Sequence, residues 1–323
     1  MMGASTMSGD FAHEPVMLDE IVEVFSTVPP GTLLDATLGG GGHSEALLDR
    51  YAELSVLGID RDEHAVAAAR QRLARFGNRV VTAQARFDHL GEAMEANAVG
   101  ELSGALFDLG VSSPQLDVAG RGFSYRNEGP LDMRMDRTQE LTADDVVNGY
   151  DGAELARIIR RYGDERFAAR IAAAIVAARP VATTAQLAAA VTEAIPAPAR
   201  RTGGHPAKRT FQAIRIEVNG ELSALPDALE AAIGATKPAG RIAVLSYHSG
   251  EDRIVKDRFR VAAGTCTCPP GLPCVCGAEQ LVRRVRAPRT PSPAQSAANP
   301  RARSARLRVV ERTAPGPATQ EIL

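Results

Sequence analysis

The sequence predicts an α/β fold in which a parallel, doubly wound sheet carries an inserted helical region. Short apolar runs alternate with helix-like stretches through the first third of the chain, as in successive strand and helix units. The next convincing buried run begins at Arg241, some 130 residues after Asp108. A connection of that length holds several elements of its own, which predicts the insertion.

Each element follows from its local pattern. Strands are expected at residues 32–34, 55–59, 79–83, 104–109 and 241–246, with alternating runs at 281–286 and 305–310 completing the sheet around a Pro/Ser/Ala-rich linker, 287–300. Helices are expected at residues 44–51, 63–76, 89–97, 153–161, 184–195 and 211–231. Phe167, Ile171 and Ile175 recur at helical spacing between arginines, which predicts one more amphipathic helix.

These elements divide the chain into three parts. We expect a disordered N-terminus at residues 1–12 and a discontinuous sheet domain formed by residues 13–123 and 209–323. Residues 124–208 would form the inserted helical domain, which we expect to recognise the substrate.

Charge and composition narrow the class of protein. The net charge is −2, yet residues 253–312 hold thirteen Lys or Arg against three Asp or Glu, a net charge of +10. Such clustering indicates either a polyanionic partner or a solvated basic face. No secretory signal and no run of about 18 apolar residues is present, so we expect a cytoplasmic protein without a membrane span.

The glycine-rich stretch Leu34–His43, LDATLGGGGH, joins a strand end to a helix start. Glycines there let a ligand approach the main chain at a helix N-terminus. Asp60 ends the second strand, 19 positions after Gly41, where an acid can bind ribose hydroxyls. Taken alone, the turn and Asp60 permit an NAD-dependent dehydrogenase or an ordinary turn. With Asp35 ahead of the glycines, the order resembles the S-adenosylmethionine site of class I methyltransferases.

The residues after the fourth strand predict the chemistry. Ligands bind at the carboxyl ends of strands in open sheets, so Asp108 and the Ser112, Ser113, Pro114 turn should face the reacting end of the cofactor. Methyltransferases that act on exocyclic or amide nitrogen carry a short polar residue before a proline here, because acceptors of the amine N–H groups activate a poor nucleophile. The alternative is that the serines only cap the following turn.

The four cysteines lie together in CTCPPGLPCVC and are Cys266, Cys268, Cys274 and Cys276. A cysteine nucleophile would permit RNA cytosine-C5 methylation, but none follows the fourth or fifth strand. Four thiolates could instead bind zinc, although this spacing departs from the usual CxxC pairs.

These residues resemble one family along nearly the whole chain, the ribosomal RNA small subunit methyltransferase H family. The matching stretches are HEPVMLDE, DATLGGGGHS, GIDRD, DLGVSSPQLD, GRGFSY, GPLDMRMD, YGDERFA, KRTFQAIRIEVN, SYHSGEDRIVK and NPRARSARLR, from His13 to Arg308. The resemblance implies a class I S-adenosylmethionine-dependent methyltransferase fold with a helical insertion. It also implies methylation of the N4 amine of a cytidine, number 1402, in the decoding region of 16S ribosomal RNA.

The resemblance further implies which residues bind each partner. The cofactor contacts would be Gly41, Gly42, His43, Asp60, Phe87, Asp108 and Gln115, with S-adenosylmethionine as cofactor. For the RNA, Phe123 and Tyr125 offer stacking surfaces, and Arg134 and Arg253 are further candidates. The small ribosomal subunit is the expected partner, a homodimer is possible, and His248 is either a supporting residue or a base. A non-catalytic RNA-binding module stays as the other alternative.

Overall fold

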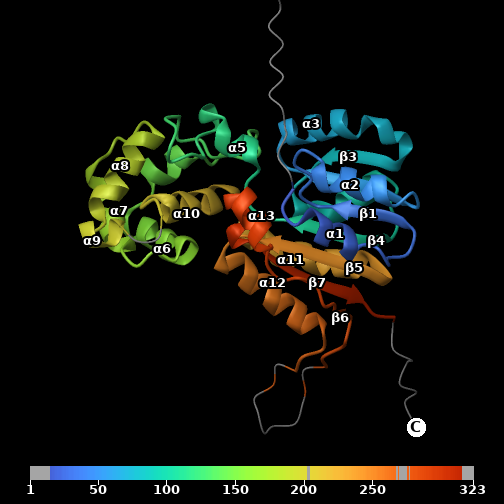
Figure 1. Ribbon diagram of the computed structural model, residues 1–323. Helices are drawn as coiled ribbons and strands as arrows, with labels where there is room; N and C mark the ends of the chain where they lie inside the picture. The colour runs from blue at the N-terminus through green and yellow to red at the C-terminus, as the bar shows by residue number, and fades with distance from the viewer. Residues whose placement is uncertain (1–14, 202–203, 267, 269–274, 276, 315–323) are drawn as a thin grey trace, which may run out of the picture.

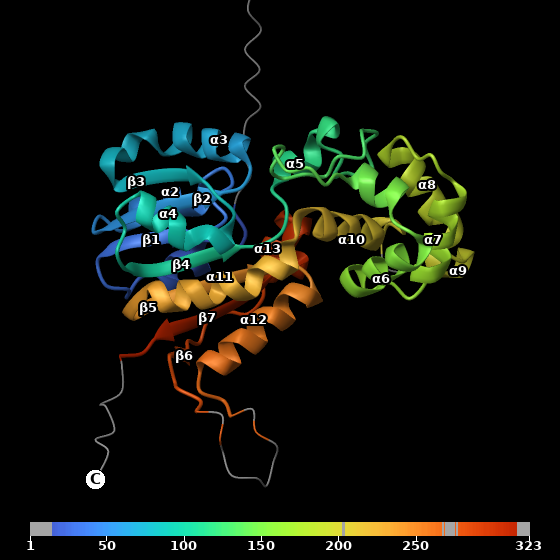
Figure 2. The same ribbon diagram turned by 180° about the vertical axis from the view of Figure 1, so that it is seen from behind.

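The computed structural model describes residues 15–201, 204–266, 268, 275 and 277–314. The N-terminus expected to be disordered, residues 1–12, lies outside these ranges. The chain folds into a sheet lobe and a helical lobe that lie side by side (Figures 1 and 2).

The sheet lobe contains one seven-stranded sheet in the order β3-β2-β1-β4-β5-β7-β6. Its strands are β1 (Gly31–Asp35), β2 (Leu54–Asp60), β3 (Val80–Gln84), β4 (Leu102–Asp108), β5 (Thr236–Ser246), β6 (Val282–Arg284) and β7 (Arg306–Arg312). The first five are parallel, and β7 lies antiparallel between β5 and β6. This arrangement confirms the predicted class I methyltransferase fold.

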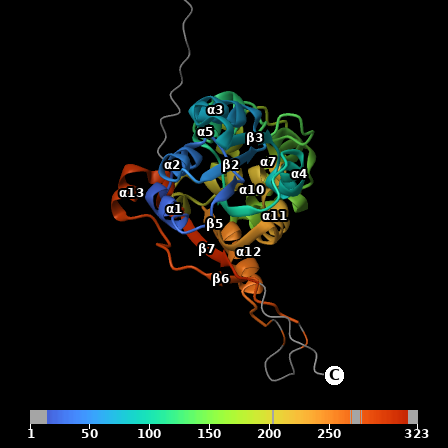
Figure 3. The same cartoon turned by 90° about the vertical axis from the view of Figure 1, so that its right-hand side faces the viewer.

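Helices cover both faces of the sheet (Figure 3). One face carries α1 (Leu18–Val24), α2 (Gly42–Arg50) and α3 (Glu63–Leu73), and the other carries α4 (Leu90–Ala96), α11 (Glu221–Ala235) and α12 (Ser249–Ala262). The first six residues of β4 are all buried, because a central strand of a parallel sheet is packed on both sides. The carboxyl ends of β1, β2, β4 and β5 therefore meet at one edge, which faces the helical lobe.

The helical lobe has its own hydrophobic core, which runs from Phe123 to Val218. Its helices are α6 (Gly152–Gly163), α7 (Ala168–Ala177), α8 (Thr184–Ala194), α9 (Ala197–Arg200) and α10 (Lys208–Asn219), and short elements at Ser113–Asp117 (α5), Ala119–Arg121 and Asp145–Gly149 lead into them. Asp151 starts α6 with a capping box that it forms with Glu154.

Three sequence predictions are corrected here. The single helix expected over 211–231 is two helices, because Gly220 adopts φ +59° between α10 and α11. Phe211 and Val218 of α10 pack in the helical core, so that core extends past residue 208. The linker expected at 287–300 contains a helix, α13 (Pro293–Ala298), because Ser292 and Gln295 form a capping box.

The remaining predicted strands and helices are present near their expected positions, with β5 starting five residues early. Among the described residues, no helix combines the length and the apolar character that crossing a membrane requires.

Candidate functional site

The glycine turn follows β1 directly and leads into α2. Gly41 adopts φ +76° as the N-terminal cap of α2, a conformation that favours glycine. A Cβ atom on Gly42 would lie 2.5 Å from Pro15 Cγ, so no larger residue fits there. Beneath the turn, the hydroxyl of Ser44 donates to the buried Asp35 carboxylate at 2.6 Å. The Ser44–Asp35 hydrogen bond thus supports the turn, and the glycines expose main-chain atoms to a ligand.

Asp60 at the end of β2 is tied to this turn. Its Oδ2 accepts from the Gly39 N–H at 2.8 Å, and its Oδ1 accepts from the Asp62 N–H at 2.9 Å. Burial raises the pKa of Asp60 to about 6, and these two N–H groups offset part of the rise. Each carboxylate oxygen keeps a second lone pair, which is what binding of a vicinal diol requires.

Asp108 at the end of β4 is held by groups from two other segments. Its N–H donates to Thr37 Oγ1 at 2.6 Å, and the Tyr247 hydroxyl donates to its Oδ1 at 2.6 Å. His43 Nδ1 lies 3.7 Å from its Oδ2. Because His43 Nε2 lies 3.0 Å from the Val16 carbonyl, which can only accept, the Nε2 atom carries the proton. Burial, and then the Asp108 charge, raise the pKa of Tyr247 well above its usual value, so this phenol stays a donor.

Gln115 is buried and joins the turn after β4 to the start of α3. Its Nε2 donates to Asp62 Oδ2 at 3.0 Å, and its Oε1 accepts from the Ser112 N–H at 3.1 Å. Asp62 also lies 2.9 Å from Arg121 Nη2. The backbone of Ser113 and Pro114 starts α5 immediately beyond. Gln115 therefore fixes the turn that holds Ser112, Ser113 and Pro114.

Phe87 begins a short 3-10 helix that follows β3, and its ring packs edge-on against Phe107 with centroids 6.1 Å apart. Together with the glycine turn, Asp60 and Asp108, it lies at the carboxyl side of the sheet. Acceptors for hydroxyls, an apolar ring and carboxylates match the ribose, the adenine and the sulfonium-bearing chain of S-adenosylmethionine, respectively. The residues present fit this cofactor.

The four RNA-contact predictions differ in outcome. Phe123 does not offer the stacking surface that was expected of it, because its side chain is only 5% exposed and belongs to the helical core. Tyr125 is half-buried, with one ring face stacked on His205 at 4.5 Å. Arg134 donates to Asp132 and to the carbonyls of Arg137 and Gln139, so it holds its own loop together. Arg253 is exposed on α12.

His248 caps α12, because its Nδ1 accepts from the N–H groups of Gly250 and Glu251. Its Nε2 lies 3.1 Å from Glu251 Oε1 but makes no hydrogen bond among the described residues, so the role that the structure shows for this ring is that of a helix cap. Cys266 and Cys268 lie beyond the other end of α12. Cys274 and Cys276 are outside the described residues, so the zinc site stays a prediction.

Comparisons with known proteins agree with this geometry. Residues 10–313 match the model of the MraW methylase family. The chain belongs to this family. A relative from Thermobifida fusca named "Ribosomal RNA small subunit methyltransferase H" is 54% identical over 94% of this chain and 94% of its own length. One of the same name from Symbiobacterium thermophilum is 51% identical over 93% of this chain and 96% of its own.

Among solved structures, a putative rRNA-methylase from Clostridium thermocellum aligns over 93% of this chain and 99% of its own, with 13% identity and a TM-score of 0.43. As a member of the methylase family, the protein uses S-adenosylmethionine as its cofactor.

Sequence reasoning missed Tyr247 and Arg121 as parts of the site. Tyr247 directly follows β5, so the rule that ligands lie at carboxyl ends of strands could have found it. Arg121 reaches Asp62 across 59 positions of the chain, and no local signal marks that pairing.

Proposed function

We propose that this protein methylates the N4 amine of a cytidine in the decoding region of 16S ribosomal RNA, cytidine 1402 in the family it resembles. The supporting observation is the placement of Asp108 and the Ser112–Pro114 turn at the carboxyl edge, beside the glycine turn and Asp60. The names of its relatives support ribosomal RNA of the small subunit as the substrate.

The amine of cytosine needs activation, because its lone pair is delocalised into the ring. An acceptor that binds the N–H hydrogens concentrates electron density on nitrogen and aims the lone pair. The Asp108 carboxylate is suited to this, since Tyr247 holds one of its oxygens in a fixed orientation. Gln115 supports the neighbouring turn through Ser112.

When bound, S-adenosylmethionine supplies an electrophilic methyl group on a sulfonium. The Asp60 carboxylate would hold its ribose hydroxyls and the glycine turn would leave room for its backbone. Holding both reactants at one edge replaces a bimolecular encounter with an oriented one, which is a large part of the rate that an enzyme of this kind must supply.

Methylation of cytosine C5 is the competing reaction, and it needs a cysteine that attacks the ring. Cys266 follows the C-terminal end of α12, whose fourteen residues span about 20 Å from the carboxyl edge. Cys268 lies two residues further along the chain. Neither of these cysteines is placed to reach a base at Asp108, which favours direct transfer to nitrogen.

We also propose that the helical lobe positions the RNA and that the two lobes act as separate units, with α10 belonging to the helical one. Because the substrate is ribosomal RNA, the cytoplasm is the proposed site of action.

The test is a nucleoside-resolved assay. Labelled S-adenosylmethionine is incubated with the protein and either 16S RNA or small subunits, and the RNA is digested to nucleosides. Label in N4-methylcytidine is expected, and Asp108→Asn should lower it by about a hundredfold or more while the cofactor-free protein melts as before. Label in 5-methylcytidine would overturn the proposal.

A further inference from the structure

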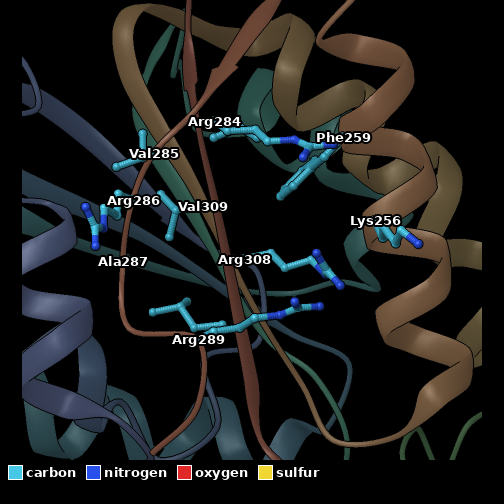
Figure 4. A pocket seen from close by; sticks show the side chains of 11 residues that line it. Lys256, Phe259, Arg284, Val285, Arg286, Ala287, Arg289, Arg308 and Val309 are labelled. Carbon is cyan, nitrogen blue, oxygen red and sulfur yellow. The ribbon is translucent and has the colours of Figure 1, made fainter. Parts of the chain in front are cut away.

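A groove runs along the outer edge of the sheet, between α12 and the chain that forms β6 and β7 (Figure 4). Five cationic side chains line it, and they are Lys256, Arg284, Arg286, Arg289 and Arg308; no carboxylate is among the described residues that line it. Figure 4 shows the side chains of Arg284, Arg289 and Arg308 reaching from the strands toward α12. We call this feature the edge groove.

Most of this charge is not neutralised. Arg308 forms a two-bond pair with Asp252 at 2.7 and 2.9 Å. Within the described part of the chain, no ion pair joins Lys256, Arg284, Arg286 or Arg289 to a carboxylate. By contrast, Arg241 of β5 and Arg283 of β6 share Glu311 of β7. Of the five cationic residues that line the groove, only Arg308 forms an ion pair with a carboxylate among the described residues, so the groove keeps unpaired positive charge.

The groove opens at the edge of the sheet where Asp108 lies. Arg306 at the start of β7 is in register with Ser246 of β5, and Leu245 beside it is in register with Asp108. From there β7 and α12 both run away from this edge, and Arg289, Arg308 and Arg284 lie one after another along this direction. A strand of nucleic acid with one base at Asp108 could therefore continue directly into the groove.

The groove offers phosphate ligands rather than a surface for bases. Phe259, the aromatic ring that lines its described part, is only 4% exposed and packs in the sheet core. Guanidinium groups bind phosphate oxygens through two parallel hydrogen bonds, and such contacts carry no sequence information. Exposed arginines at positions 284 and 289 beside the partly buried Arg308 fit an extended polyanion.

We propose that the edge groove binds phosphates of the substrate RNA strand next to the methylated cytidine. This inference rests on the proposed function, since it takes ribosomal RNA as the substrate. It adds a binding surface that lies outside the cofactor site and outside the helical lobe.

The test compares two variants of equal charge. Arg284→Gln with Arg289→Gln removes two groove cations and leaves the Arg308–Asp252 pair intact. Arg50→Gln with Arg70→Gln removes two exposed cations from α2 and α3, on the other side of the molecule. Binding of the full-length protein to a decoding-region RNA fragment is measured by fluorescence anisotropy at several salt concentrations, and cofactor binding is measured by calorimetry.

If the groove binds two phosphates through these arginines, the groove variant should bind RNA about tenfold more weakly, and the slope of log affinity against log salt should fall by about 1.4 to 1.8. When the target cytidine of the RNA is replaced by uridine, the two groove substitutions should weaken binding by the same factor. The control variant should bind RNA like the wild type. Cofactor affinity should stay unchanged, which shows that the fold and the proposed cofactor site are intact.

Wild-type RNA binding by the groove variant, with an unchanged salt slope, would overturn the inference. So would inorganic phosphate that occupies the groove and leaves RNA affinity unaffected, because the groove would then be a small-anion site. Neither outcome touches the proposed function, which the nucleoside assay decides separately.

Discussion

Asp108 is the residue on which the proposed chemistry depends, and three side chains act on it. Thr37 accepts from its N–H, Tyr247 donates to one carboxylate oxygen, and His43 lies near the other. A carboxylate held in this way loses little freedom when an amine binds, so its orientation is set before the substrate arrives.

Removing the Tyr247 hydroxyl should slow methyl transfer. Tyr247→Phe keeps the ring and deletes the donor to Asp108 Oδ1, a hydrogen bond to a charged group worth roughly 1.5–3 kcal/mol. We expect the rate constant of methyl transfer, measured in single-turnover assays, to fall by about tenfold or more. Cofactor affinity should change little. Tyr51→Phe is the matched control, because its hydroxyl donates to the Val22 carbonyl, away from the site. An unchanged rate in Tyr247→Phe would remove Tyr247 from the mechanism.

Asp60 should make cofactor binding depend on pH. The pKa of Asp60 is about 6 in the folded protein, above the ordinary aspartate value of 3.8. Protonation of Asp60 therefore stabilises the fold as the pH falls from 6 toward 4, and the full stability cost of its ionisation is present above pH 6. The ribose hydroxyls of the cofactor need the ionised carboxylate as acceptor. Cofactor affinity should therefore rise with pH, whereas the stability contribution of Asp60 falls. We expect binding about tenfold weaker at pH 5 than at pH 7, measured by calorimetry.

The Asp60→Asn variant tests whether Asp60 is the source of that dependence. Its amide NH₂ would face the N–H of Gly39 or Asp62, so binding should be weaker throughout and its pH dependence flatter. If the variant keeps the wild-type slope between pH 5 and 7, a group other than Asp60 is responsible.

The break between α10 and α11 shows what one residue contributes to an element. Asn219 is buried, and its side chain donates to the carbonyls of Met133 and Arg215 and accepts from the Met135 N–H. These bonds hold the loop before the helical core against the end of α10. The turn at Gly220 then lets the chain re-enter the sheet lobe.

Asn219→Ala should therefore destabilise the protein by about 2–4 kcal/mol, because it leaves a buried N–H and a buried carbonyl of the 133–135 loop without partners. Urea denaturation followed by circular dichroism measures this. Asn97→Ala provides the comparison, since that half-buried side chain makes a single bond to the Ala93 carbonyl and should cost below about 1 kcal/mol. Equal effects of the two changes would contradict the role given to Asn219.

The sequence predicted elements best where burial alone decides them. The strands β2 and β4 lie inside the sheet, and their nearly continuous apolar runs predict strands that are buried on both faces. The break between α10 and α11 does have a local signal, the glycine at position 220, whereas the Asn219 contacts 84 and 86 residues away that reinforce it have none. Phe123 was assigned to RNA for the same reason, since only the packed helical core shows that its ring is covered. The glycine turn and Asp60 could be predicted from the strand order alone, because they lie at the ends of consecutive strands.

At the scale of the whole molecule, a buried ion pair connects the two lobes. Arg121, at the entry to the helical lobe, lies 2.9 Å from Asp62 at the start of α3 and also donates to the carbonyls of Arg134 and Met135. Asp62 in turn accepts from Gln115, a predicted cofactor contact. The Asp62 carboxylate thus contacts both Arg121 of the helical lobe and Gln115 of the predicted cofactor site.

Arg121→Met should affect both lobes through that carboxylate. It leaves the buried Asp62 without its cation, which should cost about 3–5 kcal/mol of stability, and it frees Gln115 to shift, which should weaken cofactor binding. Adding Asp62→Asn should recover part of the stability, because the unpaired charge is then gone, so a double-mutant cycle should give a coupling above about 1.5 kcal/mol. Arg134→Met breaks a pair confined to its own loop and should leave cofactor affinity near wild type. Additive effects of the Arg121 and Asp62 changes would mean that the lobes are held together by packing alone.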